Sequence, residues 1–404
     1  MASNRKILLV VIVAALGYFV DVFDLLLFGS VRVQSLLDLG TPADHVMSVG
    51  AHIQNMQMGG MLLGGLLWGV LGDKRGRVSV LFGSILLYSL ASLGNAFIQD
   101  PETYGWLRFI TGIGLAGELG AGVTLVAEMM TPATRGFGTT IIAATGIAGA
   151  VAASVMAEHL PWRQCYVIGG AMGLVLLLLR VGTLESGMFQ RLQKHGATRG
   201  SWKLLVRDSS RLWRYVAVIM IGVPIWYVVG ILVIFSPELG RAMGLDPAPT
   251  APHAIRYCYV GLVLGDLVSG LLSQRLRSRR RAVAAFLGLT SLTLVGYFSF
   301  AAVALGVYYT FCCLLGFGAG YWAVFITTAA EQFGTNIRAT VATTAPNIVR
   351  GTVALISPVF IALASSLGVR GAAIAVGLGV FSLAVICLWR LEETYGKDLD
   401  YLET

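Results

Sequence analysis

The chain has 404 residues, of which 56% are hydrophobic and only 12% are charged. Soluble domains carry roughly 25% charged residues, so the composition excludes an ordinary soluble protein and indicates an integral membrane protein. The net charge of +8 could point to nucleic acid, but its distribution along the chain follows membrane topology. We therefore expect no nucleic-acid partner.

The apolar runs are long enough to cross a lipid bilayer as helices, because about 20 helical residues span roughly 30 Å of hydrocarbon. Most of the 29 Lys and Arg residues fall on the inner side when both termini are placed in the cytoplasm, which is the positive-inside pattern. We predict twelve spans, at 7–31, 47–71, 78–99, 105–129, 138–157, 164–183, 213–235, 255–274, 281–303, 305–329, 340–364 and 369–390.

The first span contains two acids, Asp21 and Asp24. Carboxylates three residues apart share one helical face, and each costs about 3 kcal/mol to hold charged inside a bilayer. We predict that they couple transport to protons, with a structural counter-ion role as the alternative. The segment from Asp21 to Gly29 resembles the E-W-Y-D-F-x-L-Y-G of metabolite:proton symporters and the D-G-Y-D of aromatic-acid:proton symporters.

The second span ends in a charged turn, Gly69-Val-Leu-Gly-Asp73-Lys-Arg-Gly-Arg77. Charges directly after a long apolar run hold a helix end at the membrane surface. The turn resembles G-x-L-x-D-[RK]-x-G-R-[RK], the loop between the second and third helices of the major facilitator superfamily, with Val78 in place of the last base. This resemblance implies a secondary transporter that works by alternating access.

The fourth span carries R-x-x-x-G-x-G-x-x-G-E from Arg108 to Glu118. Its glycines allow neighbouring helices to approach closely, but an acid about 20 Å deep marks a functional candidate. The run resembles the R-x-x-x-G…G-G-E-Y-G-G-A of the same symporters. We predict Glu118 as a third proton-coupling candidate, and Arg108 as a cation that neutralises Asp21, Asp24 or an anionic substrate.

Charged residues follow the fourth span and recur in the second half of the chain. Glu128 and Arg135 match the E…R-G that closes this span in sugar porters and organic-ion carriers, and Glu331 and Arg338 repeat the same seven-residue gap. This resemblance implies that these residues form a gate of ion pairs, which form in one conformation of the transporter and break in the other. The predicted gate residues are Gly69, Asp73, Arg77, Glu128, Arg135, Glu331 and Arg338.

The longest polar stretch inside the chain divides the spans six and six. We predict an N-terminal bundle at 1–185, a cytoplasmic linker with a short amphipathic helix at 186–212, and a C-terminal bundle at 213–404. The repeat places a substrate site between the halves, near the midplane. The predicted fold class is an all-α membrane protein with twelve transmembrane helices in two pseudo-symmetric six-helix bundles, the fold of the major facilitator superfamily.

Arg350 stands out in the second half, about 18 Å along the eleventh span when counted from Arg338. One interpretation is an anchor for an anionic substrate, since a guanidinium suits a carboxylate. The other is an internal ion pair with Asp266 of the eighth span, and the two are not exclusive. The predicted substrate contacts are Arg350, Arg108, Asn347, Tyr321, Trp322, Trp226, Tyr227 and Gln57.

These features predict proton-coupled uptake of a small organic acid or another anionic or zwitterionic carboxylated metabolite. The alternatives are a pH-independent facilitator or exchanger of a neutral solute such as a sugar, an exporter of a metabolite or chelator, and a receptor that binds ligand without moving it. No nucleotide-binding or hydrolase motif is found, so we expect neither an enzyme nor a cofactor or metal. The resemblance to the major facilitator superfamily implies a monomer in a bacterial inner membrane.

Overall fold

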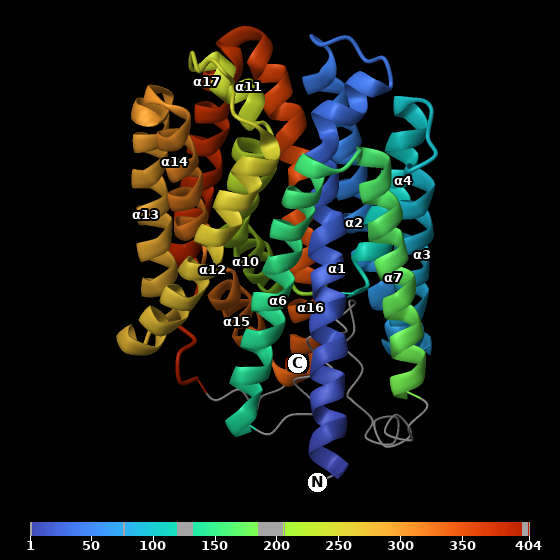
Figure 1. The fold of residues 1–404 in the computed structure, drawn as a ribbon. Coiled ribbons are helices and arrows are strands. Elements are labelled where there is room, and N and C mark those ends of the chain that lie inside the picture. Colours follow the sequence, from blue (N-terminus) through green and yellow to red (C-terminus); the bar gives the residue numbers. More distant parts are fainter. Residues whose placement is uncertain are drawn as a thin grey trace.

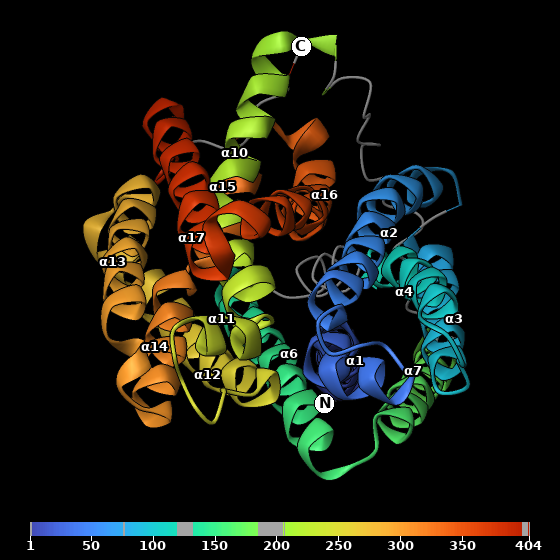
Figure 2. The ribbon, with the colours of Figure 1, turned by 90° about the horizontal axis from the view of Figure 1, so that it is seen from above.

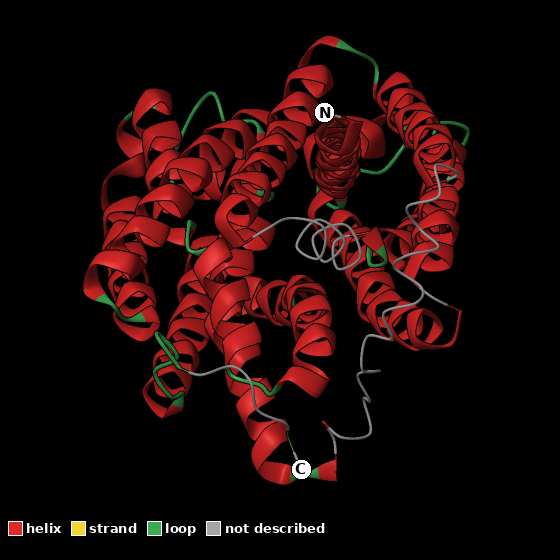
Figure 3. Cartoon of the chain, turned by 90° about the horizontal axis from the view of Figure 1, so that it is seen from below, coloured by secondary structure: helices red, strands yellow, loops and turns green. Residues whose placement is uncertain are grey.

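The computed structural model describes residues 2–75, 77–118, 132–184, 205, 207–397 and 403. All regular secondary structure in these residues is helical (Figure 3). The helices of the first half are α1 (Ala2–Asp38), α2 (Val46–Arg75), α3 (Arg77–Asn95), α4 (Pro101–Leu115), α6 (Pro132–His159) and α7 (Trp162–Leu184).

The second half begins at Asp208, which caps the first helix of this half by accepting a hydrogen bond from the Ser210 amide. The predicted linker, 186–212, lies mostly outside the described residues. The helices of the second half are α10 (Ser209–Tyr227), η1 (Val228–Val233), α11 (Ser236–Ala242), α12 (Ala251–Leu276), α13 (Arg279–Phe300), η2 (Ala301–Val303), α14 (Leu305–Ala319), α15 (Trp322–Glu331), α16 (Thr335–Gly351) and α17 (Val353–Arg390).

The prediction of twelve membrane-crossing segments is confirmed by these helices, counting those that continue across a short break as one segment. Seven helices in the described part are by themselves long and apolar enough to span a bilayer. The last two segments are joined within α17 at Gly368, whose φ of 69° is a left-handed conformation. Only glycine adopts this conformation without strain, so the chain turns there, between the two segments that the sequence predicts.

The helices form two groups, α1–α7 and α10–α17, which are seen side by side from above (Figure 2). The groups meet mainly where α6 packs against α12 and where α2 packs against α16 and α17. We call the end of the molecule that carries the N-terminus the terminal face, and the end that carries the turn between α1 and α2 the distal face (Figure 1).

The two halves repeat each other at a break in one helix. α4 and α14 each have 15 residues, and α14 begins 204 positions after α4. Each helix is interrupted at its end, after Leu115 and after Ala319, and helical structure resumes at Glu118 and at Trp322. The interruptions leave backbone groups of these helices without their intrahelical partners. Side chains from other helices satisfy some of these groups, and those side chains belong to the candidate site.

Glycines bring α4 against α2 inside the first half. A Cβ added to Gly112 would overlap the backbone carbonyl of Gln57, so only glycine permits this approach between the helices. In contrast, a Cβ on Gly288 of α13 would meet no atom within 4 Å.

We expect Gly112→Val to prevent the α2–α4 contact and to abolish folded protein, because backbone atoms cannot move aside as a side chain can. Gly288→Ala is the matched control and should leave the melting temperature unchanged or slightly raised, since alanine favours the helix by about 1 kcal/mol over glycine. Monodispersity and thermal unfolding of the detergent-solubilised protein measure both effects. A well-folded Gly112→Val variant would contradict this packing.

Candidate functional site

An ion pair joins the two halves at the middle of the molecule. Arg350 of α16 donates through Nη1 to Oδ2 of Asp21 on α1 at 3.2 Å. Asp21 is fully buried and Arg350 is 2% exposed. Isolated charges are costly at this depth, and pairing offsets part of that cost. The predicted anion anchor and one predicted proton-coupling acid therefore contact each other across the interface.

Two tryptophans of the second half lie beside this guanidinium. The rings of Trp226 on α10 and Trp322 on α15 each have their centroid 5.8 Å from Cζ of Arg350. Aromatic faces attract a cation at this distance. The arrangement gives the arginine a partly aromatic surrounding in addition to its carboxylate partner.

Two other predicted contact residues have their hydroxyl groups committed elsewhere. Tyr227 donates to the carbonyl of Ala373 at 2.7 Å, and Tyr321 donates to the carbonyl of Ile221 at 2.9 Å. Both partners lie in the second half, so these tyrosines pack inside that bundle. The sequence could not distinguish them from the two tryptophans, because each pair is adjacent in the chain.

The predicted ion pair between Asp266 and Arg350 is not formed in this conformation. Asp266 of α12 instead accepts a hydrogen bond from the backbone amide of Ala323 at 3.0 Å. That amide belongs to the first turn of α15, where the helix resumes after its break. A carboxylate at a helix N-terminus satisfies such amides. Asp266 therefore caps α15 where the helix resumes, and Arg350 pairs with Asp21 instead.

The second acid of the first span is paired within the first half. Oδ2 of Asp24 lies 3.5 Å from Nη1 of Arg108, and its Oδ1 accepts a hydrogen bond from Ser92 at 2.6 Å. The guanidinium of Arg108 also lies 4.8 Å from the centroid of the Tyr166 ring. Asp24 and Arg108 are both fully buried. Of the three partners predicted for Arg108, the structure selects Asp24.

Glu118 pairs with a residue that the sequence did not single out. Arg180 of α7 donates through Nη1 to Oε2 of Glu118 at 2.9 Å, and Nη2 contacts the other carboxylate oxygen. Both side chains are buried. Arg180 lies near the C-terminal end of α7, where a base is expected from the predicted positive-inside pattern alone. Its pairing could have been inferred only from a buried acid that still lacked a partner.

Amide side chains provide further contacts at the interface. Asn347, one helical turn before Arg350, donates to the carbonyl of Ala116 at 2.8 Å, beside the break in the fourth span. Gln54 of α2 donates to the carbonyl of Gly230 at 3.0 Å. The predicted contact Gln57 instead bonds within the first half, to the carbonyl of Leu25 at 3.3 Å.

The halves are also joined near the distal face. Arg32 of α1 pairs with Glu238 of α11 at 2.8 Å. Glu158 of α6 pairs with Arg256 at 3.2 Å and lies 3.0 Å from His253, both on α12. These contacts hold the distal ends of the bundles together, so the interface is closed on this side in this conformation.

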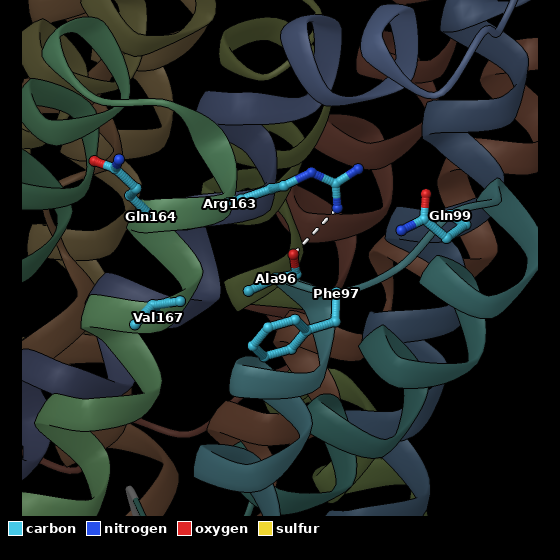
Figure 4. Close-up of a pocket in the computed structure, with 6 residues that line it drawn as sticks. All are labelled: Ala96, Phe97, Gln99, Arg163, Gln164 and Val167. Atoms are coloured by element: carbon cyan, nitrogen blue, oxygen red, sulfur yellow. Dashed lines mark hydrogen bonds between the residues drawn. The ribbon is translucent and has the colours of Figure 1, made fainter.

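A hollow on the distal surface lies apart from these ion pairs. It is lined in part by Phe97, Gln99 and Gln164, and Arg163 reaches across it to the carbonyl of Ala96 at 3.1 Å (Figure 4). Its guanidinium also binds the carbonyl of Ile98 at 2.8 Å. Arg163 thus ties the end of α3 to the start of α7, which is a structural role.

The predicted gate of the first half falls outside what the structure describes. Glu128 lies outside the described residues, as do the side chains of Asp73, Arg77 and Arg135, and Gly69 is described only by its place in α2. In the second half, Glu331 pairs with Arg279 at 3.2 Å, and Arg338 donates to the carbonyl of Phe333 at 3.2 Å. The repeated acid is therefore engaged with the loop between α12 and α13 on the terminal face.

Glu393 organises the same loop from the C-terminal segment. Its carboxylate accepts hydrogen bonds from Ser278 and from the amides of Arg279 at 2.8 Å and Arg280 at 3.3 Å. Partial burial raises the pKa of Glu393, but these hydrogen bonds outweigh that effect and lower the pKa below its usual value.

A lowered carboxyl pKa contributes stability above the unfolded-state pKa, and this contribution is lost as pH falls through the folded-state pKa. We expect Glu393→Gln to melt a few degrees below the wild type at neutral pH, and the difference to shrink towards acid pH. Thermal unfolding of both proteins across this range measures the effect, with the exposed Glu392 as the matched glutamine control. A difference independent of pH would contradict the assigned ionisation.

Comparison with known proteins places this arrangement in a family. The family model of the Major Facilitator Superfamily matches residues 14–358. The chain is 26% identical to the niacin transporter NiaP of Acinetobacter baylyi, covering 81% of this chain and 80% of that one. It is also 26% identical to the gentisate transporter of Corynebacterium glutamicum, covering 97% and 90%. The solved proton:xylose symporter XylE bound to 6-bromo-6-deoxy-D-glucose superposes with a TM-score of 0.72 at 17% identity, with 98% of each chain covered.

The fold and these matches define a multi-pass membrane transporter rather than an enzyme. The chain belongs to the Major Facilitator Superfamily.

Proposed function

We propose that the chain imports a small aromatic carboxylate together with a proton. The observation that carries this proposal is the pair between Arg350 and Asp21, which bridges the halves and is flanked by Trp226 and Trp322. The guanidinium is a forked donor suited to a carboxylate. The tryptophan rings offer apolar faces to an aromatic substrate.

The charges explain how proton and substrate would be coupled. In the empty carrier, Asp21 and Arg350 neutralise each other. When Asp21 takes a proton, Arg350 is released and binds the substrate carboxylate, so the site is neutral again. A site that holds only the proton or only the substrate carries a net charge in a buried interface, which is costly. Only the two neutral states, the empty carrier and the fully loaded carrier, would change between the conformations open to either side.

The relatives support the substrate class. Niacin and gentisate, named for the two transporters above, are both carboxylates on an aromatic ring. The xylose symporter supports the fold alone. A neutral sugar carries no carboxylate that could replace Asp21 as the partner of Arg350. An organic acid is therefore favoured over a sugar.

The remaining features fit alternating access. The contacts of Arg32 and Glu158 would close the distal side, and the gate predicted around Asp73 would close the terminal side in the opposite state. We place the terminal face in the cytoplasm of a bacterium, following the positive-inside pattern. The domain limits 1–185, 186–212 and 213–404 follow from the same division into rocking halves.

Direct binding tests the proposal. Purified protein would be titrated calorimetrically with gentisate, niacin, succinate and xylose. We expect the two aromatic acids to bind with uptake of a proton in weak buffer, and Arg350→Gln to weaken binding at least about tenfold, since hydrogen bonds to charged groups contribute about 1.5–3 kcal/mol. Arg370→Gln, which removes an arginine at the distal surface, is the control. Binding of xylose alone, or equal binding by Arg350→Gln, would overturn the proposal.

A further inference from the structure

A second arginine resembles Arg350 in its surroundings but lies near the distal face. Arg32 follows Asp21 by eleven residues on α1, which is about 16 Å along the helix. Its side chain is fully buried. Nη2 donates to Glu238 at 2.8 Å and to the carbonyl of Ile234 at 3.3 Å, and Cζ lies 4.7 Å from the centroid of the Phe235 ring.

The two arginines share three features. Each pairs with a carboxylate of the other half, each lies against an aromatic ring, and each has a buried Nε without a hydrogen-bond partner. A buried donor without a partner is costly, and Nε of Arg32 is a donor that remains available to a ligand beside the pair with Glu238.

We infer that Arg32 is a second carboxylate-binding position, which receives the anionic substrate from the distal side before Arg350 does. Glu238 belongs to the second half, so it leaves Arg32 when the halves part at the distal face. The arginine then stands at the mouth of the interface without a counter-ion, and a substrate carboxylate replaces Glu238. When the halves close again, Glu238 returns to Arg32 and the substrate is released toward Arg350.

This inference rests on the proposed function, because it takes the substrate to be an anion. It predicts that Glu238 and the substrate compete for one guanidinium. The two members of the ion pair should therefore have opposite effects on uptake, whereas a simple latch would give the same effect for either member.

The test is the KM of gentisate uptake into right-side-out vesicles. We expect Arg32→Gln to raise this KM at least about tenfold, from the loss of a charged hydrogen bond, and Glu238→Gln to lower it by removing the competitor. The double variant Arg32→Gln/Glu238→Gln leaves no unpaired charge and should fold; it should show the raised KM. Uptake into inside-out vesicles, in which substrate enters from the terminal face, should keep its KM in Arg32→Gln.

Equal changes of KM in Arg32→Gln and Glu238→Gln would mean a latch only and would overturn the inference. An unchanged KM in the double variant would do the same, while leaving the proposed function intact. If the wild type neither binds nor transports gentisate or niacin, the proposed function fails, and this inference fails with it.

Discussion

Asparagine in place of Asp21 is expected to abolish proton-driven accumulation of substrate while exchange across the membrane continues. Asparagine resembles the protonated acid, so it leaves Arg350 free for the substrate carboxylate but cannot release a proton. In proteoliposomes with an inward proton gradient, labelled gentisate should then not accumulate, because the empty carrier keeps the charge of Arg350 and does not return. Counterflow, in which unlabelled substrate inside draws in labelled substrate, should remain.

The matched control is Asp266→Asn. Asp266 is also an intramembrane acid, but it accepts a backbone hydrogen bond from Ala323, which an asparagine oxygen can still accept. We expect Asp266→Asn to accumulate substrate as the wild type does. Continued proton-driven accumulation by Asp21→Asn, or its loss only in Asp266→Asn, would show that the proton is carried elsewhere.

Glutamine in place of Glu118 is expected to destabilise the first half severely. The change leaves the buried Arg180 without its carboxylate, and removing one partner of a buried ion pair typically costs about 3–5 kcal/mol. The yield of monodisperse protein and its melting temperature in detergent should both fall. The expected cause is the loss of this buried ion pair rather than loss of a proton site.

The double variant Glu118→Gln/Arg180→Gln separates these causes, because it removes both charges. It should recover most of the lost thermal stability, since neutral replacement of a buried pair is often tolerated. If the single variant is as stable as the wild type and fails only in transport, Glu118 takes part in coupling, and the structural role assigned to it is wrong.

The sequence predicts the fold well because its signals are local. Span length and the charged turns predict the number and order of the helices. Intramembrane acids and arginines stand out by their cost alone, so Asp21, Asp24, Glu118, Arg108 and Arg350 could all be identified before the structure was known.

Partners could not be predicted in the same way. A helical residue turns by about 100° per position, so small differences in helix rotation and depth decide which acid an arginine meets. Arg350 therefore pairs with Asp21 and not with Asp266. Asp266 accepts a hydrogen bond from the backbone amide of Ala323, beside the break between α14 and α15, and no sequence motif predicts that break. Nothing in the sequence distinguishes Arg32 and Glu238 from other charged residues at helix ends, because their pairing depends on how the two halves pack together.

Uptake of labelled gentisate into proteoliposomes, with lumenal pH recorded at the same time, tests the central claim most directly. In this account Asp21 binds one proton whenever Arg350 binds one substrate carboxylate, which predicts symport of one proton per monoanion. Uptake should therefore acidify the lumen, follow the pH gradient, and ignore a potassium diffusion potential imposed with valinomycin. Uptake without acidification, or uptake that follows the membrane potential, would contradict the account.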